Sequence, residues 1–371
     1  MKSAVLSFLL FPLIGFGQTA YLDSMIKSKL TFDGQSPVPN ILIHLENVEG
    51  QVDYLKGFGR NDKDLEPVTA TSQFRIASIT KLFVSTLILQ LAEEDKLSLG
   101  DNLNEYLKQI GYLDLANIHY YNGQACAEDI TIEQLLTHRS GLADIFSDAT
   151  EAFFEFLERN PQKQHSPESI LELYYQFDLN QNAVFRPGAG WHYSDMNYVL
   201  AGLIIEQVEQ VDLAQAIRKR ILEPLMLNDT YFEYYEPQTP NNEHVHQYVG
   251  NINFTSINTS FDWAGGGLVS TNQDLITFIK ALFGCKLFSQ VSLEHMLNVQ
   301  ATDANNNPYG VGIDESNYNG DIYYGHYGFY NTYVGYCPKT KTAISYSIAQ
   351  AEPTFNVYQF ISETLAIFNA K

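Results

Sequence analysis

The hydrophobic pattern of this chain is strongest between Phe74 and Leu91, where the sequence reads FRIASITKLFVSTLILQL. From Ser78 onward, apolar residues recur at spacings of three and four, which predicts a helix with a buried stripe. Further apolar residues widen the stripe until the helix is apolar nearly all round, as is typical of a helix inside a core. The stripe consists of Ile79, Leu82, Phe83, Leu87 and Leu91, and it is widened by Val84, Ile88 and Leu89.

Shorter patterns on both sides of this helix indicate a mixture of helices and strands. Before it, we expect a helix at Tyr21–Leu30 and a hairpin of two strands, Asn40–Val48 and Val52–Phe58, with a Glu49-Gly50 turn. The other predicted helices are Ile132–Thr137, Ala149–Arg159, Pro167–Phe177, Ser194–Gln210, Leu213–Ile221, Asn272–Phe283, Val291–Val299 and Thr354–Phe368, and the other predicted strands are Tyr309–Ile313, Asp321–Tyr327, Phe329–Tyr336 and Ala343–Ile348.

These elements predict an α+β fold. We expect an antiparallel β-sheet made from both ends of the chain and flanked by helices, with an all-helical subdomain inserted in the middle. The sheet part would comprise about residues 18–99 and 260–371, and the helical insertion about residues 100–259. A catalytic cleft between two such parts would have Ser78 at its floor.

The composition is that of a folded globular chain without a nucleic-acid-binding surface. Of 371 residues, 45% are hydrophobic and only 18% are charged, so we expect a substantial core. The net charge of −21 argues against nucleic acid as a partner, because a phosphate-binding surface needs a compensating basic patch. The largest basic cluster is Arg218-Lys219-Arg220.

The first 17 residues predict a secretory signal peptide that is cut after Gly17. Lys2 precedes an apolar run from Ala4 to Phe16, and Gly15 and Gly17 are small residues two apart. The run is too short and too interrupted to be a good membrane span, so we expect a secreted or periplasmic protein without a stable membrane anchor. The three cysteines allow at most one disulfide bond.

Ser78 and Lys81 form the first candidate for chemistry. Lys81 follows Ser78 by one helical turn on the same face, so its amine can reach the serine oxygen. An alcohol becomes a good nucleophile when a neighbouring base takes its proton, and a helix N-terminus favours the developing negative charge. An isolated Ser-x-x-Lys is more often a helix cap beside a solvated lysine. Here the lysine lies in the first turn of a nearly apolar helix, which favours the catalytic interpretation.

Four further segments accompany this pair in a specific order. They are Leu135–Leu142 (LLTHRSGL), Tyr193-Ser194-Asp195, the glycine-rich Ala264–Thr271, and Gly325-His326-Tyr327-Gly328 on a predicted strand. With Ser78-x-x-Lys81, they make the whole mature chain resemble the penicillin-recognising serine hydrolases: class C β-lactamases, D-Ala-D-Ala carboxypeptidases and related esterases. The resemblance implies the β-lactamase/transpeptidase-like fold.

The resemblance also implies roles for three of these residues. In that family the serine of Ser-x-x-Lys is acylated, so Ser78 would be the nucleophile and Lys81 its activating partner. Tyr193 would shuttle the proton between the nucleophile and the leaving group. To take the Ser78 proton, either Lys81 must be neutral or Tyr193 must be anionic, and the charge of Lys81 favours a tyrosinate. We lean towards Tyr193 as the base, although coupled groups share one proton.

The strand motif of the family, Lys-Thr-Gly or His-x-Gly, falls on His326, Tyr327 and Gly328. Protonated His326 would anchor a substrate carboxylate through its charge, whereas neutral His326 would act only as a hydrogen-bonding group. The oxyanion hole would combine the backbone N–H of Ser78 with that of Phe329, which follows Gly328.

Two residues depart from the family pattern. Asp195 stands where asparagine is usual, so a carboxylate replaces the amide that would hold the acyl side chain of a substrate. Tyr327 stands where a threonine hydroxyl commonly helps to bind the substrate carboxylate. We therefore do not expect an efficient β-lactamase, although neither departure touches the acylation machinery.

Other candidate sites carry less weight. His138 in the Thr-His-Arg-Ser-Gly turn is expected to be structural and to cap the helix end. His244 and His246 form a His-x-His pattern without a recognisable third ligand, so we expect no metal and no cofactor. A Gly-x-Ser-x-Gly elbow is absent from the sequence, which argues against an α/β-hydrolase.

The function predicted is therefore that of an exported serine hydrolase that forms an acyl-enzyme on an amide or ester. Its expected substrate is a small peptide, of the D-amino-acid, cell-wall type. One alternative is an esterase that acts on small acyl esters. Another is a non-catalytic cell-wall-binding or sensor module. The sequence does not indicate an oligomeric state.

Overall fold

The computed structural model describes residues 16–47, 52–61, 65–237, 244–299, 301–302 and 308–370. Residues 1–15 of the predicted signal peptide lie outside this part of the chain, as does the predicted turn at Glu49-Gly50. Phe16 and Gly17 begin the first helix, α1 (Phe16–Lys27). None of the helices in these ranges combines the length and the apolar character that crossing a bilayer requires.

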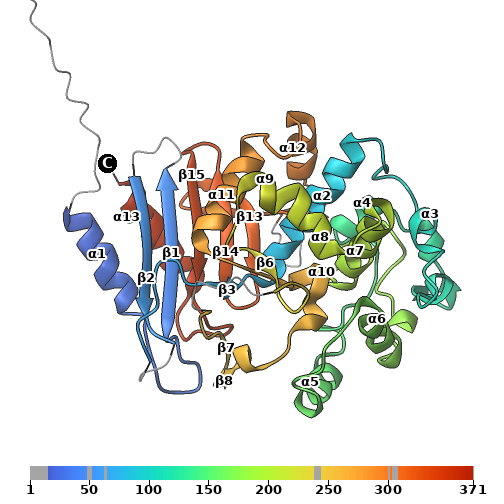
Figure 1. Ribbon diagram of the computed structural model, residues 1–371, viewed down its shortest axis with the longest axis horizontal. Coiled ribbons are helices and arrows are strands. Elements are labelled where there is room, and N and C mark those ends of the chain that lie inside the picture. The colour runs from blue at the N-terminus through green and yellow to red at the C-terminus, as the bar shows by residue number, and fades with distance from the viewer. Residues whose placement is uncertain are drawn as a thin grey trace, which may run out of the picture.

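An eight-stranded antiparallel sheet is the framework of the fold, and both ends of the chain contribute to it (Figure 1). The N-terminal hairpin pairs with the last strand, with Leu42 opposite Ser347, so the predicted α+β architecture is confirmed. In order across the sheet, the strands are β10 (Ala301–Thr302), β11 (Pro308–Tyr309), β12 (Asp314–Tyr318), β13 (Asp321–Gly328), β14 (Thr332–Cys337), β15 (Thr342–Ser347), β1 (Asn40–Asn47) and β2 (Val52–Gly59).

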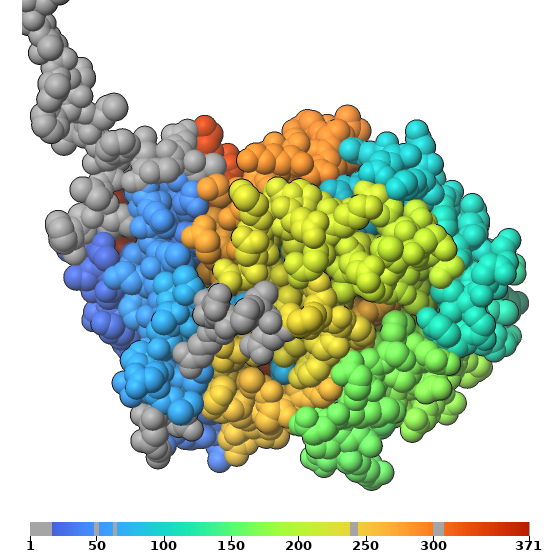
Figure 2. All heavy atoms as spheres, viewed as in Figure 1, coloured from blue at the N-terminus to red at the C-terminus, as the bar shows by residue number. Residues whose placement is uncertain are grey.

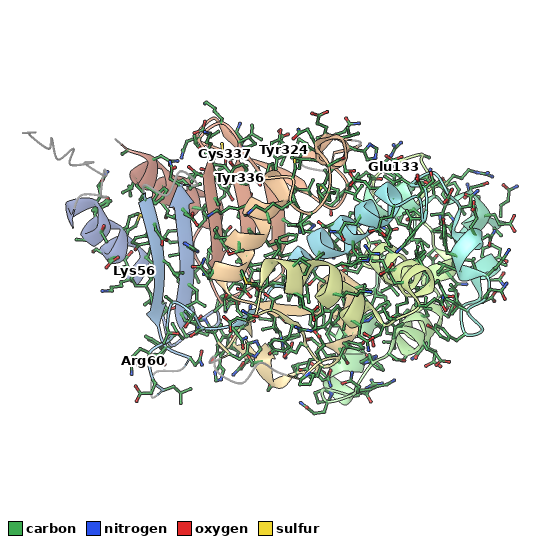
Figure 3. All side chains as sticks on the ribbon, turned by 45° about the horizontal axis from the view of Figure 1, so that its top comes forward. Lys56, Arg60, Glu133, Tyr324, Tyr336 and Cys337 are labelled. Carbon is green, nitrogen blue, oxygen red and sulfur yellow. The ribbon has the colours of Figure 1, made fainter. Side chains whose placement is uncertain are left out.

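Helices cover both faces of this sheet. On one face α1 packs with the last helix, α13 (Val357–Asn369), and on the other α11 (Asn272–Phe283) packs against β1, β14 and β15. Successive strand residues face opposite sides, so Ile41 and Ile43 join the core under α1 and α13 while Leu42 joins the core under α11. At the sheet edge Lys56 of β2 (labelled in Figure 3) pairs with Asp23 of α1 at 3.1 Å.

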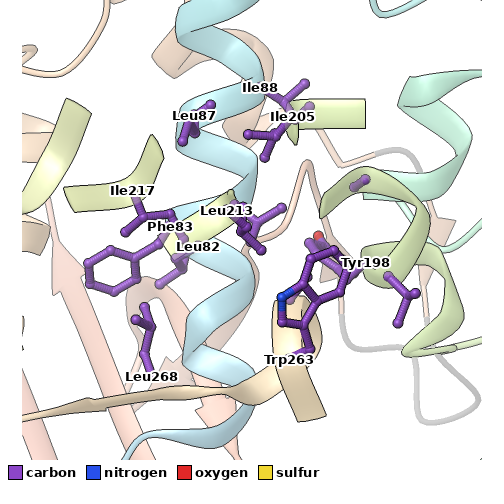
Figure 4. Close-up of a cluster of buried hydrophobic side chains, with 14 of the residues drawn as sticks. Leu82, Phe83, Leu87, Ile88, Tyr198, Ile205, Leu213, Ile217, Trp263 and Leu268 are labelled. Atoms are coloured by element: carbon purple, nitrogen blue, oxygen red, sulfur yellow. The ribbon is translucent and has the colours of Figure 1, made fainter. Parts of the chain in front are cut away.

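The central helix lies between the sheet and the helical part of the molecule. It starts as one 3₁₀ turn, η1 (Ala77–Ile79), and continues as α2 (Thr80–Glu93), so Ser78 precedes the regular helix. Phe83 stacks on Phe278 of α11 with ring centroids 3.9 Å apart. Burying each leucine or phenylalanine stabilises the fold by roughly 1.5–3 kcal/mol, so α2 is a firm base for its first turn. The neighbours that Figure 4 labels are Tyr198, Ile205, Leu213, Ile217, Trp263 and Leu268.

Helices predominate over strands in the described residues between 100 and 259, which occupy the centre and the right-hand side of the molecule in Figure 2. The division of the chain into a sheet part and a helical insertion remains a prediction. The helices here are α3 (Leu103–Leu107), α4 (Ile132–Leu136), α5 (Thr150–Arg159), α6 (Pro167–Gln176), α7 (Met196–Glu209), α8 (Leu213–Ile217) and α9 (Glu223–Leu225), and the short strands are β4 (Tyr120–Tyr121), β5 (Gln124–Ala125), β6 (Tyr231–Phe232), β7 (Tyr248–Val249) and β8 (Ile252–Asn253).

A small three-stranded sheet connects this part to the central helix. Its order is β3-β9-β6, in which β3 (Phe74–Arg75) leads into η1 and β9 (Leu268–Ser270) follows the glycine-rich segment. The short helix α10 (Trp263–Gly266) precedes β9, and α12 (Gln290–Leu297) follows α11. Ser78 therefore follows directly from a strand of one sheet and sits next to the larger sheet.

At the C-terminal end two strand predictions differ from the structure, and the strand β12 was not predicted. The strand predicted at Tyr309–Ile313 is wrong beyond Tyr309, because Gly310 N–H bonds back to the Ile313 carbonyl oxygen at 2.8 Å and closes a turn. The strand β12 escaped prediction because its sequence, DESNY, is polar and buries mainly Ser316 and Tyr318. β14 begins at Thr332 rather than at Phe329.

The cysteines do not form a disulfide. Cys126, Cys285 and Cys337 are all free thiols. Cys337 lies at the end of β14 (Figure 3), and it is buried in the core under α1 and α13. The fold is therefore held by its core rather than by covalent cross-links.

Candidate active site

Ser78 lies where the end of β13 meets the start of the central helix. Ala77 before it has φ +48°, a left-handed conformation that is unusual for alanine and typical of strained functional positions. Gly328 packs directly on this turn, since a β-carbon there would lie 2.3 Å from the Ile76 carbonyl oxygen. Thr332 also donates a hydrogen bond to that oxygen at 3.0 Å. The turn that carries Ser78 is thus fixed against the sheet.

The Lys81 side chain is fully buried and has three acceptors. Its Nζ lies 3.0 Å from Ser78 Oγ, 2.6 Å from Asp195 Oδ1 and 2.8 Å from the Gly265 carbonyl oxygen. An isolated ammonium would be costly to bury, so the Asp195 carboxylate is what stabilises the charged form here. Lys81 contacts Ser78 as the one-turn spacing indicates.

Tyr193 precedes α7 and lies beside both residues. Its phenol is hydrogen-bonded to Ser78, and Lys81 Nζ lies 4.9 Å from its ring centroid. Burial and then the Asp195 charge raise the pKa of Tyr193 well above its usual value. A resting tyrosinate is therefore disfavoured. Our expectation counted the positive charge of Lys81 but not the carboxylate that neutralises it.

His138 holds the segment that carries Tyr193. Its Nδ1 accepts hydrogen bonds from the Ser194 N–H at 3.2 Å and from the Asn197 amide at 3.0 Å, and its ring lies 4.1 Å from that of Tyr193. Burial and the Lys81 charge keep the pKa of His138 well below its usual value, so the ring is neutral. His138 thus closes the end of α4 with its backbone N–H, which donates to the Leu135 carbonyl oxygen at 3.1 Å, and anchors the entry to α7 with its side chain.

The side chain of Asp195 lines the cleft, but its carboxylate is engaged within the protein. Its carboxylate pairs with Lys81, and its backbone N–H donates to Asp144 Oδ1 at 2.8 Å. Asp144 Oδ2 also accepts the N–H groups of Phe146 and Ser147, at 3.1 and 2.9 Å. Burial, and then the charge of Asp195, raises the pKa of Asp144 to about 6.

His326 is not the cationic anchor that we considered. Its Nδ1 lies 2.6 Å from the Tyr327 carbonyl oxygen, which can only accept, so Nδ1 carries the proton. Nε2 then accepts from the Tyr309 hydroxyl at 2.9 Å. Burial, reinforced by the charge of Lys81, lowers the pKa of His326 to about 3. The ring is neutral at physiological pH and positions Tyr309, which the sequence analysis did not identify.

Tyr327 and Phe329 also line the cleft. The Tyr327 hydroxyl accepts from Ser316 at 3.3 Å and pairs with the Tyr318 hydroxyl, so it is already engaged within the protein. Phe329, the first residue after β13, is 53% exposed, and its ring stands at the mouth of the cleft.

The cleft beside Ser78 has a volume of about 1020 Å³. Aromatic rings make up most of its apolar wall, and α5 contributes to one side. The aromatic lining residues are Phe146, Phe153, Phe154, Trp191, Tyr193, Phe254, Phe261, Tyr309, Tyr327, Phe329, Tyr330 and Tyr358. A cleft of this size admits a ligand larger than a single amino acid.

Asp262 is a further lining residue that sequence reasoning missed. It ends the 3₁₀ turn η7 (Ser260–Asp262), just before α10, and burial followed by the charge of Asp195 raises its pKa to about 7. Neither Asp144 nor Asp262 belongs to a short motif, and each becomes unusual only through tertiary burial.

The His-x-His pattern does not build a metal site in the described part of the chain. His244 is partly buried, and its desolvation lowers its pKa to about 4. Over the ranges that the structure describes, no group of three His, Cys, Asp or Glu side chains is arranged to hold a metal ion.

Comparison with known proteins agrees with this geometry. The Beta-lactamase family model matches residues 47–363. The chain belongs to the Beta-lactamase family. The predicted family is therefore confirmed.

Similar proteins come from distant organisms. Protein flp of Staphylococcus aureus (strain MW2) is 30% identical over 301 residues, which cover 78% of this chain and 55% of that protein. The D-stereospecific amidohydrolase of Streptomyces sp. has a TM-score of 0.76 at 22% identity, covering 95% of this chain and 99% of that one. The octameric penicillin-binding protein homologue of Pyrococcus abyssi has a TM-score of 0.75 at 25% identity, and the match covers 95% of this chain and 76% of that one. The chain spans about half the length of the curated relatives that it matches.

Proposed function

We propose that this protein is an exported serine hydrolase that cleaves amides or esters through an acyl-enzyme on Ser78. The observation that carries the proposal is the 3.0 Å contact between Ser78 Oγ and Lys81 Nζ, next to the cleft and Tyr193. Membership in the Beta-lactamase family agrees with this chemistry. Export rests on the signal peptide predicted from the first 17 residues.

In this mechanism Lys81 and Asp195 accept the serine proton together. Lys81 first passes one of its three ammonium protons to Asp195, and the neutral amine then takes the Ser78 proton as Oγ bonds to the substrate carbonyl carbon. Lys81 is thus positively charged again beside the developing oxyanion. Tyr193 gives its proton to the leaving nitrogen or oxygen and is reprotonated from Asp195 through Lys81. Water later repeats the sequence in reverse and releases the acyl group.

The oxyanion hole consists of the backbone N–H groups of Ser78 and Phe329. The contact of Gly328 with the Ile76 carbonyl supports this assignment, because it brings the end of β13 against the turn that carries Ser78. Two N–H groups held by a rigid frame stabilise the charge that develops on the carbonyl oxygen. Asp144 and His138 act as positioning residues for Asp195 and Tyr193.

The substrate is a small peptide of D-amino-acid type. The similarity to a D-stereospecific amidohydrolase and to a penicillin-binding protein homologue supports this class. Small esters are a second candidate, favoured by the aromatic wall of the cleft. A purely binding module is disfavoured, because the contacts among Ser78, Lys81 and Tyr193 serve no purpose in ligand binding alone.

A fluorophosphonate probe tests the proposal directly. We expect one equivalent of label per chain, attached to Ser78, because this is the hydroxyl that Lys81 activates. Intact-mass analysis gives the stoichiometry, and peptide mapping gives the position. Prior incubation with a D-amino-acid amide or a small ester should protect Ser78. Labelling of the native protein at another serine, or none at all, would contradict the proposal.

Replacing Asp195 by asparagine tests the role of the carboxylate. Asparagine is the usual residue of the family at this position, yet we expect kcat for a neutral ester to fall by about 10- to 100-fold. The reason is that an amide cannot take the proton that Lys81 releases. Steady-state kinetics on the full chain give the measurement. An unchanged or higher kcat would exclude Asp195 from proton transfer and leave Lys81 as the sole acceptor.

A further inference from the structure

The wall of the cleft is acidic. Within the described residues, carboxylates line it and no lysine or arginine does. Lys81 lies beneath the wall and is paired with Asp195, and His326 is neutral. A cleft lined by charges of one sign attracts ligands of the opposite sign. The lining carboxylates are Asp144, Asp195, Asp262, Asp314, Glu315 and Glu352.

Asp262 differs from Asp144 and Asp195 because no group in the described part of the chain binds its carboxylate. Asp195 pairs with Lys81, and Asp144 accepts backbone N–H groups, whereas in the described chain the Asp262 carboxylate has no hydrogen-bond or ion-pair partner. A β-carbon placed on Gly266 would lie 3.3 Å from the Asp262 carboxyl carbon and 3.5 Å from the Ala77 carbonyl carbon. Asp262 therefore lies close to the turn that carries Ser78.

Arg75 of β3 is a basic residue close to Asp262, but its guanidinium is already hydrogen-bonded to other groups. Arg75 donates to both oxygens of Glu233, at 2.7 and 3.1 Å, to the Tyr234 hydroxyl at 2.8 Å and to the Phe254 carbonyl at 2.7 Å. Its charge acts on Asp262 only from a distance. Because the partly exposed Asp262 carboxylate lacks a counter-ion, a ligand that brings a cation into the cleft gains more here than in water.

Aromatic rings line the same cleft as Asp262. Phe254, Phe261 and Tyr330 are each at most 6% exposed, and the rings of Phe254 and Tyr330 lie 6.2 Å apart. Such rings accommodate an apolar body, and their faces attract a positive charge. The acidic and the aromatic lining residues thus both favour a ligand that carries a positive charge on an apolar body.

We propose that the cleft selects substrates that carry an ammonium group, which Asp262 binds, on an apolar body that packs against these rings. The inference rests on the proposed function. It restricts the expected substrates to peptides, amides and esters that carry an amine at one end. Substrates with a carboxylate near the scissile bond are repelled. The cleft therefore disfavours β-lactams and peptides cleaved at their C-terminal residue.

Binding of the cation depends on pH through Asp262. With a pKa near 7, about a tenth of the carboxyl is ionised at pH 6 and about nine-tenths at pH 8, so affinity for a cation rises with pH. An alkylamine of pKa ~10 stays charged over this range. The charged groups that face Asp262 are Asp195, Glu233, Arg75 and Lys81, and the phenols that face it are Tyr234, Tyr235 and Tyr330.

The test uses three p-nitroanilides of equal acyl length that end in ammonium, methyl or carboxylate. We expect kcat/KM to be highest for the ammonium compound and lowest for the carboxylate. Asp262→Asn should lower kcat/KM for the ammonium compound by about 10- to 100-fold. It should change kcat/KM for the methyl compound by less than about threefold. The ratio of KM values for the methyl and ammonium compounds should rise about tenfold from pH 6 to pH 8 in the wild type only. Glu158→Gln, which removes one exposed charge from α5 outside the cleft, should change kcat/KM for neither compound.

A binding measurement separates this inference from the proposed function. Calorimetry of Ser78→Ala with the ammonium compound needs no turnover, and Asp262→Asn in that background should weaken binding by the same factor. Weakened binding without turnover in the wild type would support the cation site and overturn the hydrolase. Turnover of all three compounds at equal kcat/KM, or an unchanged preference in Asp262→Asn, would overturn the cation site and leave the hydrolase intact.

Discussion

Replacing Ser78 by alanine is expected to lower kcat/KM for any amide or ester substrate by at least ~10⁴-fold and to abolish labelling by a fluorophosphonate. The alanine variant lacks the hydroxyl that accepts from the Lys81 ammonium at 3.0 Å, so no acyl-enzyme forms. The fold should remain intact, because Ser78 lies in a turn held by Gly328 and Thr332 rather than by its own side chain. Initial rates and intact mass give the measurement.

A matched control for this variant is Ser166→Ala. Ser166 is also a serine at the start of a helix, where its hydroxyl caps α6, but it is exposed and outside the cleft. Its loss should cost about 1 kcal/mol of stability and leave both labelling and turnover unchanged. If the Ser78 variant were labelled or turned over substrate at the wild-type rate, the acyl-enzyme mechanism would be wrong.

Replacing Lys81 by methionine is expected to have the second-largest effect. It should lower both the activity and the stability of the protein, and the two losses can be measured separately. Activity should fall by at least ~10²-fold, because the proton acceptor for Ser78 is lost. Stability should fall by about 3 kcal/mol, because the Asp195 carboxylate loses its counter-ion in a site where only 17% of its side chain is exposed. Steady-state kinetics measure the first part, and urea unfolding measures the second.

The double variant Lys81→Met/Asp195→Asn distinguishes these parts. Removing both charges leaves no stranded carboxylate, so most of the lost stability should return. Activity should stay as low as in Lys81→Met alone, because the two residues act as one proton-accepting unit. Recovery of activity together with stability would show that Lys81 supports catalysis only by keeping the site folded.

The elements that depend on interactions between neighbouring residues could be predicted from the sequence. The helix α2 follows from apolar residues at helical spacing, and the β1–β2 hairpin follows from two strand patterns around a turn. Strand β12 could not be found in this way. Its polar residues form a strand because β13 offers hydrogen bonds along its whole length, and a single sequence does not contain that partner.

The same division holds within the candidate site. The proximity of Ser78 and Lys81 depends on one helical turn, so the sequence alone indicates it. The charge states depend on groups from distant segments. Asp195 comes close to Lys81 across a separation of 114 residues, and His326 loses its proton because burial and the Lys81 charge disfavour its cation.

The α+β fold and the motifs that carry the family resemblance could therefore be predicted from the sequence, because motif spacing and hydrophobic periodicity are properties of neighbouring residues. The charge states depend on the tertiary structure. The pKa of Asp262 is raised first by burial, and the tyrosinate form of Tyr193 is disfavoured by its burial and then by the Asp195 carboxylate, which pairs with Lys81. Burial and Coulomb energy depend on distances in space, and the linear sequence does not contain them.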